Sequence, residues 1–167
     1  MDFKNAQELL ALCEEHQLPI SEIMRQREVI VGESTFESVD SQMKRVLEIM
    51  KDAAFSPIKS PVKSMGGLIG GEAQKLSEHL ASGKGICGDV LEKAITYAMA
   101  TLETNASMGL IVASPTSGSA GIVPGLLLAL QEIYHFSDKE TEKVLFNAGA
   151  IGYLAMRNAT VAGAVGG

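Results

Sequence analysis

The sequence is poor in the residue types that mark several classes of protein. It has no tryptophan and only eight other aromatic residues, and its fourteen basic side chains form no run and are outnumbered by twenty acidic ones. A nucleic-acid surface, which needs clustered positive charge, therefore has no basis here. Two cysteines, Cys13 and Cys87, cannot form a disulfide framework, and this indicates a reducing compartment.

Long apolar runs and nucleotide-binding motifs are also missing. No stretch approaches the ~20 apolar residues of a membrane-spanning helix, and the segment 1–4 begins with polar residues. We therefore expect a cytoplasmic protein that inserts into no membrane. No GxGxxG fingerprint follows a predicted strand and no GxxxxGK[ST] loop occurs, which excludes the common dinucleotide and phosphate folds. The three histidines lie too far apart in sequence to suggest a zinc site.

What remains is a sequence rich in helical periodicity. Nearly half of the residues are hydrophobic, and mean hydropathy is +0.16, so the chain can bury a core. Apolar residues recur at spacings of three and four, and polar capping patterns, such as Asn5 followed by Glu8, precede several of these segments. The sequence predicts an all-α fold: a single compact helical domain, 1–167, of six or seven helices with glycine-rich loops. The segment 123–134 is predicted to be a central buried helix, and 110–113 a buried extended connector.

A loop of small and hydroxylated residues, 113–125, precedes that central helix. Pro115 disfavours helix at the preceding residue, and the first turn of the following helix presents unpaired N–H groups. Together with the hydroxyls of Thr116, Ser117 and Ser119, this predicts a cradle for a small anion, either carboxylate or phosphate. The alternative is that these hydroxyls only cap the first turn of the helix.

A second glycine-rich segment, 56–71, is predicted to be a long loop. It carries Lys59 and Lys63, which suit an anionic substrate. Ser60 and Lys63 also fit the SxxK spacing of serine acyl-enzymes, but the other motifs of that class are absent. Farther along, Cys87 stands between two glycines, where it is either a reactive thiol or, as we expect, a buried small residue. Cys13 lies on the apolar face of the first helix and is expected in the core.

Three segments together resemble a known family. The segments 66–73 (GGLIGGEA), 105–109 (NASMG) and 114–124 (SPTSGSAGIVP) are similar to the α subunit of the iron-sulfur-dependent L-serine dehydratases. The resemblance covers nearly the whole chain. It implies an enzyme that converts L-serine to pyruvate and ammonia, with an oxygen-sensitive 4Fe-4S cluster held by three cysteines. One iron would act as a Lewis acid on the serine hydroxyl.

The resemblance also implies which residues form the site. The central loop would grip the substrate carboxylate through Thr116, Ser117, Gly118, Ser119 and Ala120. Gly66 and Gly67 would form the adjoining wall, with Lys63 as an electrostatic contact. The general base is unassigned, because a β subunit or β domain normally supplies part of the site. The enzyme is expected to be an oligomer.

One departure from the family pattern concerns the cluster. The segment 158–167 is similar to the family segment that precedes the first cluster cysteine, so all three ligands are expected beyond Gly167. We therefore expect this chain alone to bind no cluster and to be an inactive fragment. The alternative function is a non-catalytic all-α interaction module that packs against a partner subunit.

Overall fold

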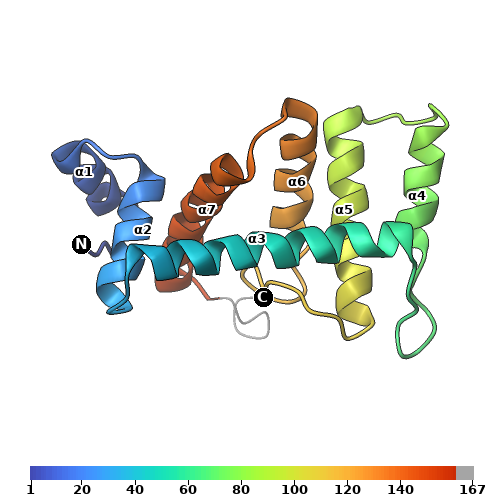
Figure 1. Ribbon diagram of the computed structural model, residues 1–167, viewed down its shortest axis with the longest axis horizontal. Helices are drawn as coiled ribbons and strands as arrows, with labels where there is room; N and C mark the ends of the chain where they lie inside the picture. Colours follow the sequence, from blue (N-terminus) through green and yellow to red (C-terminus); the bar gives the residue numbers. More distant parts are fainter. Residues whose placement is uncertain (161–167) are drawn as a thin grey trace. The chain divides into compact units, whose positions relative to one another are not determined.

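The computed structural model describes residues 1–160, which form seven helices and no strand (Figure 1). This confirms the predicted all-α class. The helices are α1 (Ala6–His16), α2 (Ile20–Val31), α3 (Phe36–Lys59), α4 (Glu72–Ala81), α5 (Asp89–Ala106), α6 (Ile122–Tyr134) and α7 (Asp138–Asn158). Among the described residues, no helix is both long and apolar enough to span a bilayer. Residues 161–167, most of the tail that was compared with the family segment before the first cluster cysteine, lie outside the described part.

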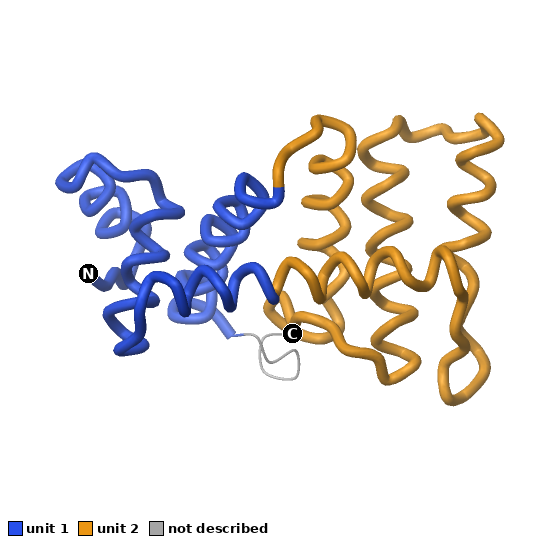
Figure 2. Tube along the Cα trace, in the orientation of Figure 1, with its two compact units in different colours: residues 1–45, 138–167 blue, residues 46–137 orange. Residues whose placement is uncertain are grey.

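The chain is organised as two compact units (Figure 2). Unit 1 contains residues 1–45 and 138–167, and unit 2 contains residues 46–137. All the residues predicted to bind substrate belong to unit 2.

Unit 1 is built around α2 and α7, with α1 beside them. The capping pattern predicted at Asn5 is present, since its Oδ1 accepts the N–H of Glu8 at 2.9 Å. Apolar side chains from these helices, from the segment before α1 and from the start of α3 form the core: Phe3, Leu9, Ile23, Met24, Val39, Phe146 and Ala150. Cys13 packs against this cluster, as expected for a core cysteine.

Unit 2 is organised around the antiparallel pair α5 and α6, which approach each other closely. A Cβ at Gly121 would lie 2.6 Å from the Ala98 carbonyl oxygen, and one at Gly125 would lie 2.6 Å from that of Ala94. These two glycines therefore allow the helices to touch through their backbones. The predicted central helix, α6, is buried along this side, where Leu128 is 1% exposed.

Helix α3 continues farther than the sequence predicted. The loop was expected from residue 56, but the helix includes Pro57 and ends at Lys59. Proline has no N–H, so the carbonyl of Ala53, four residues earlier, loses its helical partner. The hydroxyl of Thr104 on α5 donates to that carbonyl at 2.9 Å. A tertiary hydrogen bond thus replaces the missing helical one.

Two predictions of burial were wrong. Cys87 is exposed rather than buried, because it lies in the turn between α4 and α5, where every residue from 82 to 88 is exposed. The connector 110–113 has no regular structure, but it is not buried, since Leu110 is 64% exposed.

Candidate functional site

The last turn of α5 holds the first of the three family-like segments through a buried carboxylate. Glu103 is 2% exposed, and its two oxygens accept the N–H groups of Gly71 at 3.0 Å and Ala73 at 2.7 Å. These N–H groups belong to the start of α4, where unpaired donors and the helix dipole favour a negative charge. Glu103 therefore fixes the end of the glycine-rich loop against α5.

Neighbouring residues of the same turn contact other segments. The side-chain amide of Asn105 donates to the carbonyl of Ser117 at 3.5 Å, a long hydrogen bond that links the second family-like segment to the third. Thr104, between Glu103 and Asn105, donates to α3 as described above. Three consecutive side chains at the end of α5 thus connect to α4, α3 and the central loop.

The hydroxyls of the central loop are used mainly to close the loop. Ser119 Oγ donates to the carbonyl of Ser114 at 3.0 Å and lies 3.1 Å from Thr116 Oγ1. It also accepts the N–H of Thr116 at 3.3 Å. Helix α6 has Gly121 at its N-cap position and no side-chain cap. The capping alternative is therefore wrong: the hydroxyls bond within the loop, not to the first turn of the helix.

This leaves a smaller set of anion donors than the sequence indicated. In residues 1–160, the Ser117 side chain makes no hydrogen bond, and neither do the N–H groups of Ser117 and Gly118. Both residues are exposed, whereas the following Ala120 is fully buried and anchors the loop. Ser117 and Gly118 are the positions where the loop can offer donors to an anion.

The glycine-rich loop before α4 is folded on itself. The Ser64 N–H donates to the Ile69 carbonyl at 2.8 Å, with Gly66 and Gly67 exposed at the tip. Gly70 has φ +139°, and a Cβ there would lie 2.1 Å from the Val62 carbonyl oxygen, so only glycine fits. The loop geometry therefore depends on Gly70.

Lys63 is exposed and forms no hydrogen bond or ion pair with any described residue. Its charge is thus available to solvent or to a ligand. The SxxK alternative fails on geometry, because α3 ends at Lys59 and Ser60 and Lys63 do not share a helical turn. An acyl-enzyme mechanism using this pair has no structural support.

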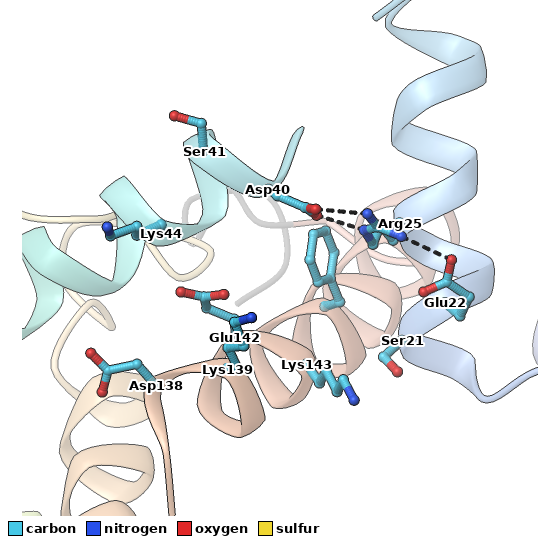
Figure 3. A pocket seen from close by; sticks show the side chains of 11 residues that line it. Ser21, Glu22, Arg25, Asp40, Ser41, Lys44, Asp138, Lys139, Glu142 and Lys143 are labelled. Atoms are coloured by element: carbon cyan, nitrogen blue, oxygen red, sulfur yellow. Dashed lines mark hydrogen bonds and ion pairs between the residues drawn. The ribbon is translucent and has the colours of Figure 1, made fainter. Parts of the chain in front are cut away.

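A cavity of about 670 Å³ lies elsewhere, in unit 1 (Figure 3). Its walls carry acidic and basic side chains from α2, α3 and α7, with the buried Phe146 among them. Arg25 forms a bidentate pair with Asp40 at 2.6 and 2.7 Å and bonds Glu22 at 3.0 Å. The hydrogen bonds from Arg25 hold the pKa of Asp40 below its usual range. This network joins α2 to α3, and no predicted site residue lines the cavity.

The described residues do not fit a metal cluster. No group of three Cys, His, Asp or Glu side chains in residues 1–160 could hold a metal ion. The two cysteines fall in different units, Cys13 in unit 1 and Cys87 in unit 2. Cys87, His79 and Glu92 line one apolar groove of about 280 Å³ between α4 and α5, but among the described residues they do not form a group that could hold a metal ion.

Comparison with known proteins gives one consistent family. The family model described as "Serine dehydratase alpha chain" matches residues 15–167. The chain is 41% identical to the probable L-serine dehydratase alpha chain of Bacillus subtilis and 35% identical to the L-serine dehydratase alpha chain of Peptoniphilus asaccharolyticus. It is 30% identical to the L-serine dehydratase TdcG of Escherichia coli. These matches cover 99%, 97% and 98% of this chain.

The relatives are longer than this chain. The matched region is 55% of the Bacillus protein, 56% of the Peptoniphilus protein and 37% of the Escherichia protein. The chain thus spans about half the length of the two relatives named as alpha chains, and a smaller share of the one named simply as a dehydratase.

Proposed function

This chain belongs to the serine dehydratase alpha chain family, and from that membership we propose that it forms the substrate-carboxylate site of an L-serine dehydratase. The observation that carries the proposal is the convergence of the three family-like segments on the last turn of α5. Glu103 binds the start of α4, and Asn105 reaches the central loop. Three segments that are separated in sequence thus come together at the end of α5.

The proposed reaction eliminates water from L-serine. The proton on Cα and the hydroxyl on Cβ leave, and the resulting enamine tautomerises and hydrolyses to pyruvate and ammonia. Such an elimination requires the substrate to be held while a base reaches Cα. The contribution assigned to this chain is holding the carboxylate; we assign it no general base.

The carboxylate is proposed to bind at Ser117 and Gly118. The Ser117 hydroxyl and the two backbone N–H groups supply donors, while the bonded pair Thr116 and Ser119 keeps the loop closed around them. Hydrogen bonds to a charged acceptor are stronger than those between neutral groups. Gly66 and Gly67 are proposed as the adjoining wall, with the exposed Lys63 adding positive charge.

The iron-sulfur cluster that the family resemblance implies is proposed to be held outside the described residues. Among residues 1–160, neither cysteine has the companions that a cluster needs. When bound, such a cluster would supply a Lewis acid for the departing hydroxyl. The chain is accordingly proposed to have no dehydratase activity alone and to work in an oligomer with a β subunit or β domain.

The proposal can be tested in a chimeric alpha chain. Residues 1–167 would replace the matched region of the Bacillus subtilis alpha chain, produced anaerobically with its β subunit, and pyruvate formation would be followed against L-serine concentration. Ser117→Ala should raise the apparent KM about tenfold or more, because a hydrogen bond to a charged group is lost. Thr116→Ala and Ser119→Ala should raise it by loosening the loop.

The matched control is Ser41→Ala, an exposed serine in unit 1 that should leave KM unchanged. An unchanged KM in all three loop variants would remove the assigned role. Circular dichroism of each variant separates loss of binding from loss of fold.

A further inference from the structure

The helix pair α5–α6 of unit 2 exposes large aliphatic side chains along one side. On α5 these are Leu91, Ile95 and Leu102, which are 51%, 40% and 41% exposed. On α6 they are Ile122 and Leu126, which are 67% and 47% exposed. Spacings of four and seven residues place each set on one face of its helix. We call these five residues the α5–α6 face.

The two sets lie on the same side of the helix pair. The helices touch at Ala94 and Ala98 on α5 and at Gly121 and Gly125 on α6, and the order of these contacts makes the pair antiparallel. Ile122 and Leu126 each follow a contact glycine by one residue, as Ile95 follows Ala94. A step of one residue turns by the same angle around each helix. Because the two helices run antiparallel, this turn brings both sets of side chains to the same side of the pair.

The other side of α5 is already covered within unit 2. Tyr97 packs edge-on against Phe55 of α3, with ring centroids 5.1 Å apart, and Thr104 bonds to Ala53 of the same helix. In the view of Figure 1, the second half of α3 passes across α5 and α6. Helix α5 therefore has α3 over one face and, elsewhere on its circumference, an aliphatic face that stays exposed among the described residues.

The face continues toward α4. Ile95 also lines the apolar groove of about 280 Å³, together with Leu76, Leu80 and Ile86, and Ile86 is 94% exposed. Single exposed aliphatic residues are common on soluble proteins, but a continuous set of this kind marks a surface that is covered by protein.

We propose that the α5–α6 face is the docking surface for the part of the family alpha chain that this chain does not span. That part is 45% of the Bacillus subtilis relative, since the matched region is 55%. The occupant would cover the bare side of α5 and complete the hydrophobic core of unit 2. The inference rests on family membership and not on the proposed activity, so a failure of either can be recognised separately.

The test compares thiol labelling in two proteins in which Cys13→Ser and Cys87→Ser remove the native cysteines of residues 1–167, and only the peptide that carries the introduced cysteine is followed. Leu102→Cys and Leu126→Cys are introduced singly into the 167-residue chain and into the chimeric alpha chain, and maleimide labelling is followed by mass spectrometry. Labelling should be rapid in the chain alone and roughly tenfold or more slower in the chimera, because covered sites react only on local opening. The control, Leu10→Cys in unit 1, starts from 54% exposure and should label at similar rates in both.

A second measurement does not depend on labelling. Leu126→Gln should leave the thermal midpoint of the chain alone unchanged but lower that of the chimera, where the amide would be buried without a partner. Equal labelling rates at Leu102 and Leu126 in the two proteins, with equal thermal effects, would overturn the proposal. So would slow labelling of the chain alone that accompanies a dimer in sedimentation, because the occupant would then be a second copy.

Discussion

At the scale of single residues, Glu103 is the side chain on which the candidate site depends most. Its carboxylate is almost completely buried and satisfies two N–H groups at the start of α4. Nothing in the sequence around it distinguishes it from other polar residues in an apolar helix. Its role arises only because α4 begins beside the last turn of α5.

Replacing Glu103 should therefore destabilise unit 2 strongly. Glu103→Ala leaves two buried N–H groups without acceptors, at a cost of about 3 kcal/mol in the free energy of unfolding. Urea unfolding followed by circular dichroism would measure this. Glu78→Ala, which removes an exposed carboxylate on the neighbouring helix α4, is the matched control and should change stability by less than about 0.5 kcal/mol. Equal effects of the two variants would contradict the account of Glu103.

Sequence reasoning identified the residues of the central loop but not how they are used. Thr116, Ser117 and Ser119 have equivalent side-chain chemistry, so all three were predicted as donors to a ligand. In the structure, Thr116 and Ser119 bond to each other and to the loop backbone, and only Ser117 is left with its hydroxyl available. Which hydroxyls bond within the loop and which one stays available depends on loop geometry. The chemistry of the hydroxyl group alone does not determine that geometry.

At the scale of elements, the helix boundaries were predictable where they depend on local pattern and not where they depend on distant partners. The Asn5 cap is a local feature, and it was confirmed. The continuation of α3 through Pro57 was missed because the compensating donor, Thr104, lies on another helix. Cys87 was misplaced for a related reason: a small side chain between glycines is compatible with either a buried contact or an exposed turn.

The compensation at Pro57 can be measured with a double-mutant cycle. Thr104→Val keeps the shape of the side chain but removes the donor to the Ala53 carbonyl, and it should cost about 1 to 2 kcal/mol of unfolding free energy. In a Pro57→Ala background the restored N–H can bond to that carbonyl, so the same change should cost less. A cost that is identical in the two backgrounds would show that the hydroxyl does not replace the helical bond.

The close approach of α5 and α6 makes a second prediction about elements. Gly125→Ala would place a Cβ 2.6 Å from the Ala94 carbonyl oxygen and 3.0 Å from the Ala98 Cβ, so the helices must separate. We expect a loss of about 1 to 3 kcal/mol, measured by urea unfolding. Gly152→Ala in α7 is the control, because no described atom lies within 4 Å of the added Cβ. The Gly152→Ala change should leave the free energy of unfolding unchanged or raise it by up to about 1 kcal/mol. A loss of stability as large as that of Gly125→Ala would contradict the close packing of α5 and α6 as its cause.

At the scale of the whole molecule, the chain is a family member that matches about half of its alpha-chain relatives. Its described residues contain the proposed carboxylate loop and its supporting helix but no group able to hold a metal ion. The proposed function divides the work between this chain and the rest of the enzyme. This chain would orient one end of the substrate, and residues outside it would act on the other.

A direct consequence concerns iron. After anaerobic reconstitution with iron and sulfide, the 167-residue chain should contain no stoichiometric 4Fe-4S cluster, whereas the chimeric alpha chain should contain one. Iron and acid-labile sulfide analysis, together with the visible absorption of the cluster, would measure both. Cys13→Ser with Cys87→Ser serves as the control for adventitious iron, and it should match the unmodified chain. A stoichiometric cluster on residues 1–167 would contradict the account.

The central claim is that this chain forms the substrate-binding part of an L-serine dehydratase. The most direct measurement is L-serine-dependent pyruvate formation by the reconstituted chimeric alpha chain with its β subunit, compared with the chain alone. The account predicts turnover by the chimera, a higher KM in its Ser117→Ala variant, and none by the 167-residue chain. A chimera that folds, assembles and holds its cluster but forms no pyruvate from L-serine would contradict it.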